Sequence, residues 1–232
     1  MYEITRLVQL ANPDDTHVLD EVIEHVRAAA SSTGATTTLV SPTLPGVRNG
    51  GDFVVHLQFE SEHQWRRIRA DFDRATSNES VSYVNSVEYH SANTRLAGDS
   101  GRRQPAGRGI VYRTLLLRVA ETASNQQIDE FERALLRMPQ YVSSIQAWQL
   151  SHVAEAGGDA RWTHVWEQEF ADLSGLLGEY MNHPIHWASV DAFFDPENPL
   201  CIVKDRVCHS FCIADESVVA TIERAGSVDS AL

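Results

Sequence analysis

The segment GGDFVVHLQFES, residues 50–61, predicts a tight turn followed by a strand, and GGDARWTHVWEQEF, residues 157–170, repeats this arrangement later in the chain. Each half opens with an apolar strand that contains an arginine, YEITRLVQL (2–10) or GIVYRTLLL (109–117). It continues into an amphipathic helix and then into a second strand that leads into the Gly-Gly-Asp turn. After each turn come a strand, a second helix and a closing strand. Both halves therefore predict the order β-α-β-β-α-β, which is the ferredoxin-like unit.

Composition sets the predicted boundaries of these units. The first ferredoxin-like repeat takes residues 1–92 and the second takes residues 109–213. Residues 93–108 are rich in glycine, arginine and small side chains, so we expect a linker of extended or flexible character. Residues 214–232 lie outside the repeats and are expected to form a short helix or a frayed tail.

A four-stranded sheet with both helices on one face leaves its other face uncovered, so two such sheets should pack face to face. Two fused repeats supply that pair within one chain. The sequence therefore predicts an α+β fold built as a dimeric-type α+β barrel, with the helices outside. A homodimer of the two-repeat chain is a further expectation.

Charge and composition exclude several classes of partner. The chain has 232 residues, 43% of them hydrophobic, and a formal net charge of −13. Nucleic acid and anionic membranes would be repelled by this charge, so neither is an expected partner. The sequence shows no secretion signal and no apolar stretch long enough to cross a bilayer, so we expect a cytoplasmic protein.

The three cysteines, Cys201, Cys208 and Cys212, lie together near the end of the chain and do not resemble a disulfide framework. Cys208, His209 and Cys212 could suggest a metal site. However, the stretch LCIVKDRVCHSF, residues 200–211, predicts a strand, in which the two cysteines lie about 13 Å apart and His209 faces the opposite way. No metal site is expected.

Alternation along the strands predicts which side chains share a face. In the first half one face is wholly apolar, and in the second half the matching face contains a histidine; the two sets are Phe53, Val55, Leu57 and Phe59, and Trp162, His164, Trp166 and Phe170. We expect both sets to line the interior between the sheets. His56 falls on the other face of its strand and is expected to point outward.

Each half places an arginine on an apolar strand face, Arg6 in the first and Arg113 in the second. A buried guanidinium needs a carboxylate, a backbone carbonyl or an anionic ligand. Because both halves have one, the simpler explanation is a structural arginine tied to a helix end or to the other repeat. The alternative is that Arg113 contacts a substrate.

The stretch EYMNHPIHWASVDAFF, residues 179–194, predicts a helix, a break and a second helix. Pro184 interrupts the helical pattern and moves His183 away from helical geometry. A new helix can begin at Pro184, and on it His186, Val190 and Phe193 share one stripe. We therefore expect His186 to point inward among apolar neighbours.

The motif YMNHPIH, residues 180–186, together with THVWE, residues 163–167, resembles the stress-responsive dimeric A/B barrel (Dabb) family, whose members carry a Tyr…His-Pro-x-His segment on the second helix. The resemblance covers nearly all of the second half. In the first half it extends only to the architecture and to the strand FVVHLQFES, residues 53–61. None of the motif occurs there, so one site per chain is expected.

The resemblance implies a function, because the family includes plant polyketide cyclases that close a ring by aldol chemistry without a cofactor. By motif, their working tyrosine and histidine correspond to Tyr180 and His186, and their strand histidine corresponds to His164. A further histidine of those cyclases is absent here, where the first strand of the second half offers Arg113 or Tyr112. Because of this departure, the resemblance does not imply the same substrate or the same reaction.

The chemistry of these groups fits that implication. Histidine can take a proton in one step and return it in the next, and a tyrosine hydroxyl can donate to a developing oxyanion. His186 is the predicted acid and base, with Tyr180 and His164 as donors. The side chains predicted to hold an aromatic or polyketide-like substrate are Arg113, Trp162, Trp166, Trp187, His183 and Phe193.

Each of these residues also has a structural interpretation. The aromatic side chains could serve core packing, and His183 could be a helix cap or a surface residue. Tyr180 and His186 could form a buried hydrogen bond that pins the helix break.

We therefore weigh three functions. The first is a cofactor-independent lyase or cyclase that makes or breaks a carbon–carbon bond, for example with loss of a small aldehyde. The second is a noncatalytic stress-response barrel that binds a small apolar ligand. The third is a barrel that holds haem through an axial histidine.

Overall fold

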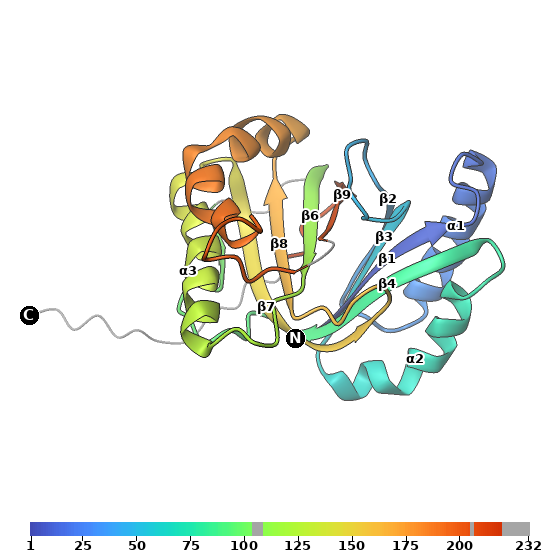
Figure 1. The fold of residues 1–232 in the computed structure, drawn as a ribbon. Helices are drawn as coiled ribbons and strands as arrows, with labels where there is room; N and C mark the ends of the chain where they lie inside the picture. Colours follow the sequence, from blue (N-terminus) through green and yellow to red (C-terminus); the bar gives the residue numbers. More distant parts are fainter. Residues whose placement is uncertain (104–108, 205–206, 220–232) are drawn as a thin grey trace, which may run out of the picture.

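The computed structural model describes residues 1–103, 109–204 and 207–219, which form a nine-stranded sheet with helices on its outer side (Figure 1). The first half contains β1 (Tyr2–Leu10), α1 (Thr16–Ser31), β2 (Thr37–Pro42), β3 (Phe53–Phe59), α2 (Glu62–Thr76) and β4 (Val81–His90). The short strand β5 (Ser100–Arg102) follows. The second half contains β6 (Ile110–Leu117), α3 (Asn125–Tyr141), β7 (Ile145–Gly157), β8 (His164–Phe170), the π-helical segments η1 (Gly175–Tyr180) and η2 (His186–Val190), the 3-10 turn η3 (Asp191–Phe193) and β9 (Cys208–Ala214).

The strands of each half follow a ferredoxin-like order. Their neighbours are β2-β3-β1-β4 in the first half and β7-β8-β6-β9 in the second, and every pair is antiparallel. The ferredoxin-like α+β class predicted from the sequence is confirmed. Among the described residues, no helix is long and apolar enough to cross a membrane.

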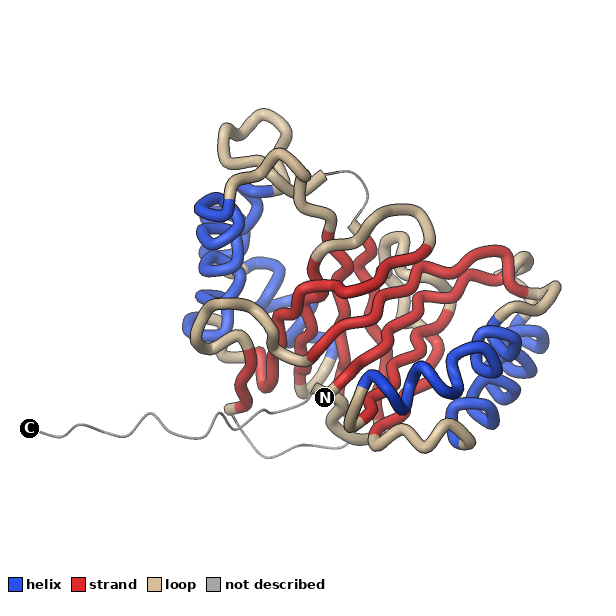
Figure 2. Tube along the Cα trace, turned by 90° about the horizontal axis from the view of Figure 1, so that it is seen from below, coloured by secondary structure: helices blue, strands red, loops and turns tan. Residues whose placement is uncertain are grey.

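The two halves are joined at both edges of the sheet. Strand β4 pairs with the end of β7, from Ser86↔Gly157 to Tyr89↔Val153. On the other side the loop after β2 meets β9 through the isolated bridges Thr43↔Cys212 and Arg48↔His209. The strands consequently curve into two facing layers, with α1 and α2 outside one layer and α3 outside the other (Figure 2).

The Gly-Gly-Asp turns lie where the sequence predicts, between β2 and β3 and between β7 and β8. The second glycine of each turn has a left-handed backbone, with φ of 75° at Gly51 and 102° at Gly158. A Cβ at Gly51 would lie 2.7 Å from the Val8 carbonyl oxygen, and one at Gly158 would lie 2.7 Å from that of Val84. Only glycine therefore fits where these turns touch the neighbouring strand.

The side chains of each predicted face stay together except Trp162, which packs between the sheets and so does lie in the interior. For the other members of the two sets, the prediction that they line the interior is wrong. The apolar face of β3 packs against α1 and α2, in a cluster that includes Val26, Trp65 and Phe72. The corresponding face of β8, with Trp166 and Phe170, packs against the helical layer of the second half. His56 is fully buried between the two sheets, so the expectation that it points outward is also wrong.

The interior between the sheets holds polar side chains that bond to one another. Gln149 donates from Nε2 to Glu3 and to Glu167, each at 2.8 Å, and the Tyr112 hydroxyl donates to Glu167 at 2.5 Å. Burial, and then the charge of Glu3, raise the pKa of Glu167. His56 lies 3.5 Å from Glu167, and burial lowers its pKa to about 3.

This polar interior explains why the apolar strand faces do not line the space between the sheets. Both faces of β3 are buried, so hydrophobicity alone does not say which one meets the helices. The helices offer apolar side chains, whereas the opposite sheet offers hydrogen-bond partners, so the polar face turns toward the sheet.

The linker and the end of the chain differ from expectation in detail. Ser100–Arg102 form β5, which pairs with β7. The final strand begins at Cys208 rather than near Leu200, because Val203 bridges to Val119 at the end of β6. Residues 104–108 of the predicted linker and 220–232 of the predicted tail lie outside the described residues.

Candidate functional site

A helix break places Tyr180 and His186 side by side. Pro184 has no N–H, and the chain leaves helical geometry at His183, whose Nδ1 accepts a hydrogen bond from the Ile185 N–H at 3.3 Å. The break lies between η1, which ends at Tyr180, and η2, which begins at His186. The two rings meet edge to face with centroids 5.1 Å apart.

These rings line a cavity of about 450 Å³, here called the Arg113 pocket. It lies between the outer face of β6 and β9 and the helical layer of the second half. Its lining consists of Arg48, Asn49, Arg113, Leu115, Leu135, Tyr180, Met181, His186, Val190, Asp191, Phe194, Val207 and His209. An apolar wall with a few convergent polar groups is typical of a small-molecule site.

Arg113 is the central polar group of this pocket. Its residue is 3% exposed, and its guanidinium donates to Tyr180 Oη at 3.2 Å and to His209 Nε2 at 2.8 Å. A third hydrogen bond goes to Gln168 Oε1. The guanidinium carbon also lies 4.9 Å from the centre of the Tyr180 ring.

All three acceptors of Arg113 are uncharged groups. Within the described ranges, no carboxylate lies at ion-pair distance from this guanidinium. Burial lowers the pKa of Arg113, but a guanidinium remains charged in a protein. The pocket therefore contains a buried positive charge that a ligand oxyanion could neutralise.

His209 is held neutral by its surroundings. Burial, followed by the charges of Arg113 and Arg48, lowers the pKa of His209 to about 2. Since its Nε2 accepts from Arg113, its proton sits on Nδ1. His209 thus fixes the guanidinium without adding charge.

His186 has the features of a proton acceptor. Its side chain is 14% exposed, and Nδ1 lies 3.5 Å from Asp191 Oδ1. Burial is the largest influence and lowers the pKa of His186, although the Asp191 charge opposes it. A neutral imidazole with Nδ1 turned to Asp191 has Nε2 free to take a proton. The Tyr180 hydroxyl accepts from Arg113 and so retains its own proton for donation.

Comparison with known proteins gives a family match in the second half of the chain. Residues 111–209, which contain the lining residues from Arg113 onward, match the family model described as Stress responsive A/B Barrel Domain. This part of the chain is therefore similar to the Dabb domain. A search of curated proteins by sequence found no match.

Solved structures resemble nearly the whole chain. An anthrone oxidase-like protein is 12% identical, with a TM-score of 0.67 over 95% of this chain and 96% of that one. A proposed monooxygenase from Lactobacillus acidophilus NCFM is 12% identical, with a TM-score of 0.53 over 94% and 98%. A mutant chlorite dismutase from Candidatus Nitrospira defluvii is 10% identical, with a TM-score of 0.52 over 92% and 91%. At these identities the likeness shows a shared fold.

The structure does not bring His164 together with Tyr180 and His186. His164 pairs with Leu117 across the sheet, four residues along β6 from Arg113, which is roughly 13 Å at strand spacing. Its Nε2 lies 3.2 Å from Glu132 Oε1 instead. His164 therefore belongs to a different cluster.

The aromatic residues predicted to hold substrate lie outside the Arg113 pocket. Trp162 donates to Asn85 at 3.3 Å and packs between the sheets, and Trp166 is buried in the core beneath the helices. Phe193 packs against that same core, whereas its neighbour Phe194 lines the pocket.

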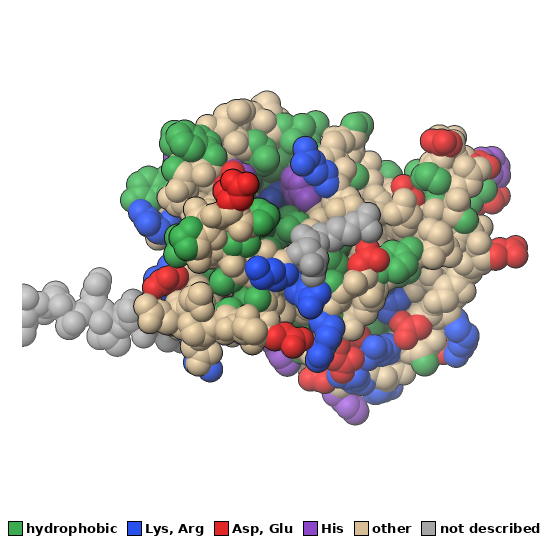
Figure 3. All heavy atoms as spheres, in the orientation of Figure 1, with side chains coloured by type: hydrophobic (Ala, Val, Ile, Leu, Met, Phe, Trp, Pro, Cys, Tyr) green, Lys and Arg blue, Asp and Glu red, His purple; other side chains and the backbone are tan. Residues whose placement is uncertain are grey.

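Trp187, which was also predicted to hold substrate, lies on the surface of the helical layer. Trp187 is 59% exposed, and Leu177 and Met181 near it in sequence are exposed as well. Hydrophobic side chains gather over this layer, at the upper left of Figure 3. His183 is half-buried and serves the helix break described above.

His209 and Phe194 are pocket residues that the sequence argument missed. His209 alternates with Cys208 and Cys212, which are buried between the sheets, so alternation places it on the opposite face, as predicted. That face is the one that carries Arg113 on the adjacent strand. The alternation that argues against a metal site therefore also places His209 beside Arg113.

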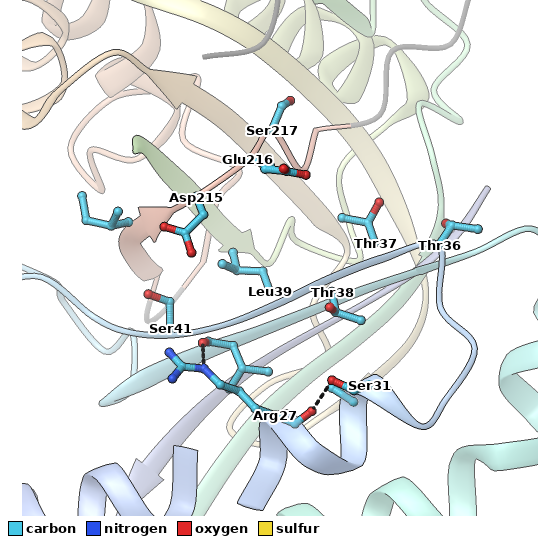
Figure 4. A pocket seen from close by; sticks show the side chains of 13 residues that line it. Arg27, Ser31, Thr36, Thr37, Thr38, Leu39, Ser41, Asp215, Glu216 and Ser217 are labelled. Carbon is cyan, nitrogen blue, oxygen red and sulfur yellow. Dashed lines mark hydrogen bonds between the residues drawn. The ribbon is translucent and has the colours of Figure 1, made fainter. Parts of the chain in front are cut away.

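A larger cavity, of about 780 Å³, lies between β2, the end of α1 and residues 213–217 (Figure 4). Serine and threonine hydroxyls dominate its lining, and Arg27 there donates to the Val40 carbonyl at 3.0 Å. Asp215 and Glu216 also border it. This cavity has no histidine, so it lacks the acid–base pair of the Arg113 pocket.

Two groups among the described residues could hold a metal ion: Glu132, His152 and His164, and Glu3, His56 and Glu167. The second group is fully buried between the sheets. In the first, burial raises the pKa of Glu132, but the two histidines together lower it to about 2. Cys208 and Cys212 lie in the core between the sheets and belong to neither group.

Proposed function

We propose that the protein is a cofactor-independent lyase or cyclase that makes or breaks a carbon–carbon bond in a small aromatic or polyketide-like carbonyl compound. The observation that carries this proposal is the convergence of Arg113, Tyr180 and His186 in one pocket. Arg113 supplies a positive charge, Tyr180 a hydroxyl donor and His186 a proton acceptor. A pocket of about 450 Å³ suits one or two rings.

In the condensing direction, His186 takes the proton next to a substrate carbonyl, and the electron pair moves onto the carbonyl oxygen. Arg113 and Tyr180 stabilise this oxyanion. The enolate carbon then forms the new bond to a second carbonyl, whose oxygen receives the proton held by His186. The reverse sequence takes a hydroxyl proton, breaks the bond and releases an aldehyde or ketone.

The experiment is to incubate the protein with phenolic ketones, hydroxyaldehydes and polyketide mimics, and to measure binding by calorimetry and products by mass spectrometry. His186→Gln should lower turnover by about 100-fold or more and leave ligand affinity nearly unchanged. His17→Gln is the matched control, because this histidine is exposed on α1 and lies outside the pocket, so the variant should retain activity. Equal turnover in wild type and His186→Gln would overturn the proposal.

A noncatalytic ligand-binding barrel is the second candidate, favoured by the apolar lining of the pocket. It predicts tight binding of a panel compound that is never consumed. Haem binding, the third candidate, predicts a Soret band when haem is added to the purified protein, and a band lost in His186→Gln would place the haem in this pocket.

We also infer that the chain is a fused pair of ferredoxin-like repeats, residues 1–92 and 109–213, forming one barrel. The equal strand order of the halves and their two left-handed Gly-Gly-Asp turns support this inference. A cytoplasmic location and a homodimer of the whole chain are separate proposals. For the homodimer, light scattering should give twice the chain mass of 25.9 kDa.

A further inference from the structure

Glu132, His152 and His164 come from three different elements and meet at one point. Glu132 lies on α3, His152 on β7 and His164 on β8. Nε2 of His152 lies 2.5 Å from Glu132 Oε1, and Nε2 of His164 lies 3.2 Å from the same oxygen. The ligand atoms of all three residues lie within 4.8 Å of one another.

The carboxylate of this cluster is costly where it stands. Glu132 is 1% exposed, and its helix neighbours Phe131 and Leu135 are core residues. The two imidazoles are the partners that hold its oxygen. A buried carboxylate requires a compensating positive charge, which protonated imidazoles or a bound cation can supply.

A second hydrogen bond orients His164. The Thr163 hydroxyl lies 2.8 Å from Nδ1 of His164, and it also accepts from the Val119 N–H at 2.9 Å. With the proton on Nδ1 toward Thr163, Nε2 gives up its hydrogen bond to Glu132 and offers its lone pair to an ion. This tautomer, with an outer hydrogen bond on the other ring nitrogen, is the one that metal-bound histidines adopt.

The cluster is open on one side. A cavity of about 270 Å³ lies against it, bordered by Arg95, Asn125, Ile128 and Asp129. The His152 side chain is 38% exposed, so the site can be reached from solvent. Three ligands on one wall and free space on the other leave coordination positions for water or a small ligand.

We propose that Glu132, His152 and His164 bind a divalent transition-metal ion of the Zn²⁺ type. Two imidazoles and one carboxylate form a ligand set typical of open zinc and iron sites, whereas Mg²⁺ and Ca²⁺ prefer oxygen ligands. In a tetrahedral zinc site the ligand atoms lie roughly 3.3 Å apart. The 3.2 Å between His164 Nε2 and Glu132 Oε1 matches this spacing, and the 2.5 Å between His152 Nε2 and the same oxygen would widen when an ion binds. The ion would supply the charge that compensates the buried carboxylate.

This site is independent of the proposed function. His164 is separated from the Arg113 pocket along the sheet, and no residue borders both cavities. Whether the Arg113 pocket is catalytic therefore does not affect the metal proposal, and the reverse also holds.

The test is to strip the full-length protein with a chelator and to measure Zn²⁺ binding by equilibrium dialysis and elemental analysis. We expect one equivalent for the wild type, and loss of more than about 100-fold in affinity for His152→Asn. His152 is the choice because its partial exposure makes the substitution safe for folding. Co²⁺ should give the visible bands of a low-symmetry site in the wild type and lose them in the variant.

His90→Asn is the matched control, because His90 is an exposed histidine 3.7 Å from a carboxylate, that of Glu62. It should bind Zn²⁺ as the wild type does. Glu132→Gln and His164→Asn, checked for folding by circular dichroism, should behave as His152→Asn. A wild type that binds no Zn²⁺, or a His152→Asn variant that keeps full affinity, would overturn the proposal.

Discussion

The two halves of the molecule each bury an arginine in their first strand, yet only one of these is neutralised. Arg6 in the first half forms an ion pair with Asp73 on α2. Arg113 in the second half contacts Tyr180 and His209, neither of which is negatively charged. The first arrangement is complete in itself, whereas the second has room and charge for a ligand.

The rings beside these arginines extend the comparison. The guanidinium of Arg6 lies 4.9 Å from the centre of the Phe72 ring, and that of Arg113 lies 4.9 Å from the centre of the Tyr180 ring. The second half therefore keeps the same stacking and adds a hydroxyl. The two arginines therefore share a stacking ring but differ in whether a carboxylate neutralises them.

Tyr180→Phe gives the second half the ring that the first half has, and we expect the largest effect from it. The variant keeps the stacking on Arg113 but loses the donor to a developing oxyanion. Turnover of the panel substrate should fall by about 100- to 1,000-fold with the fold intact. Steady-state kinetics and circular dichroism measure the two quantities, and a variant as active as the wild type would assign Tyr180 to packing alone.

Gln168→Glu supplies the carboxylate that Arg113 lacks. The new charge should occupy the guanidinium and repel an anionic ligand, weakening its binding by about 100-fold, or about 2.7 kcal/mol. Calorimetry with the tightest anionic compound of the panel measures this change. Unchanged affinity would mean that the ligand does not pair with Arg113.

His209→Gln tests the neutral partner of Arg113 through pH. The folded pKa of His209 is about 2, below the ordinary value of 6.5, so the unfolded state takes the proton first as the pH falls. Stability is then lost below pH 6.5, by about 2 kcal/mol at pH 5. Between pH 7 and 5, urea unfolding should show the wild type losing about 2 kcal/mol more than the variant, and parallel curves would contradict this.

Asp73→Asn removes the charge that neutralises Arg6, and we expect the smallest effect from it. The Asp73 side chain is 45% exposed, so water replaces much of the lost interaction. The free energy of unfolding should fall by about 1 kcal/mol, with ligand binding at the Arg113 pocket unchanged. A change in that binding would show that the two halves are coupled.

The sequence predicted the order of elements and the side chains that share a face. It placed Arg113 with Val111 and Leu115, and the three lie on one side of β6. It did not predict which side the helices cover, because both faces of these strands are buried. That choice depends on the partners each face meets across the molecule, which is information from the other half of the chain.

The candidate site was predictable where its residues are close in sequence. Tyr180 and His186 flank a proline break, and the motif and the helical stripe bring them together. His209 and Glu132 reach their clusters from distant elements, so only the strand order places them. Glu132 is the one charged residue among those that α3 buries. Its position four residues after Ile128 and four before Leu136, on the apolar stripe, was nevertheless a readable signal of a buried polar cluster.

The bonds of Gln149 to both Glu3 and Glu167 have a consequence for assembly. A purely apolar interface between two sheets allows them to shift relative to each other, because hydrophobic contacts are not directional. Here one amide must reach two carboxyl groups from different sheets, which is possible in only one register. A shift by one residue would leave both carboxyl groups without this hydrogen-bond donor. These hydrogen bonds therefore specify how the first sheet packs on the second sheet of the same chain. This specificity disfavours domain swapping between neighbouring molecules.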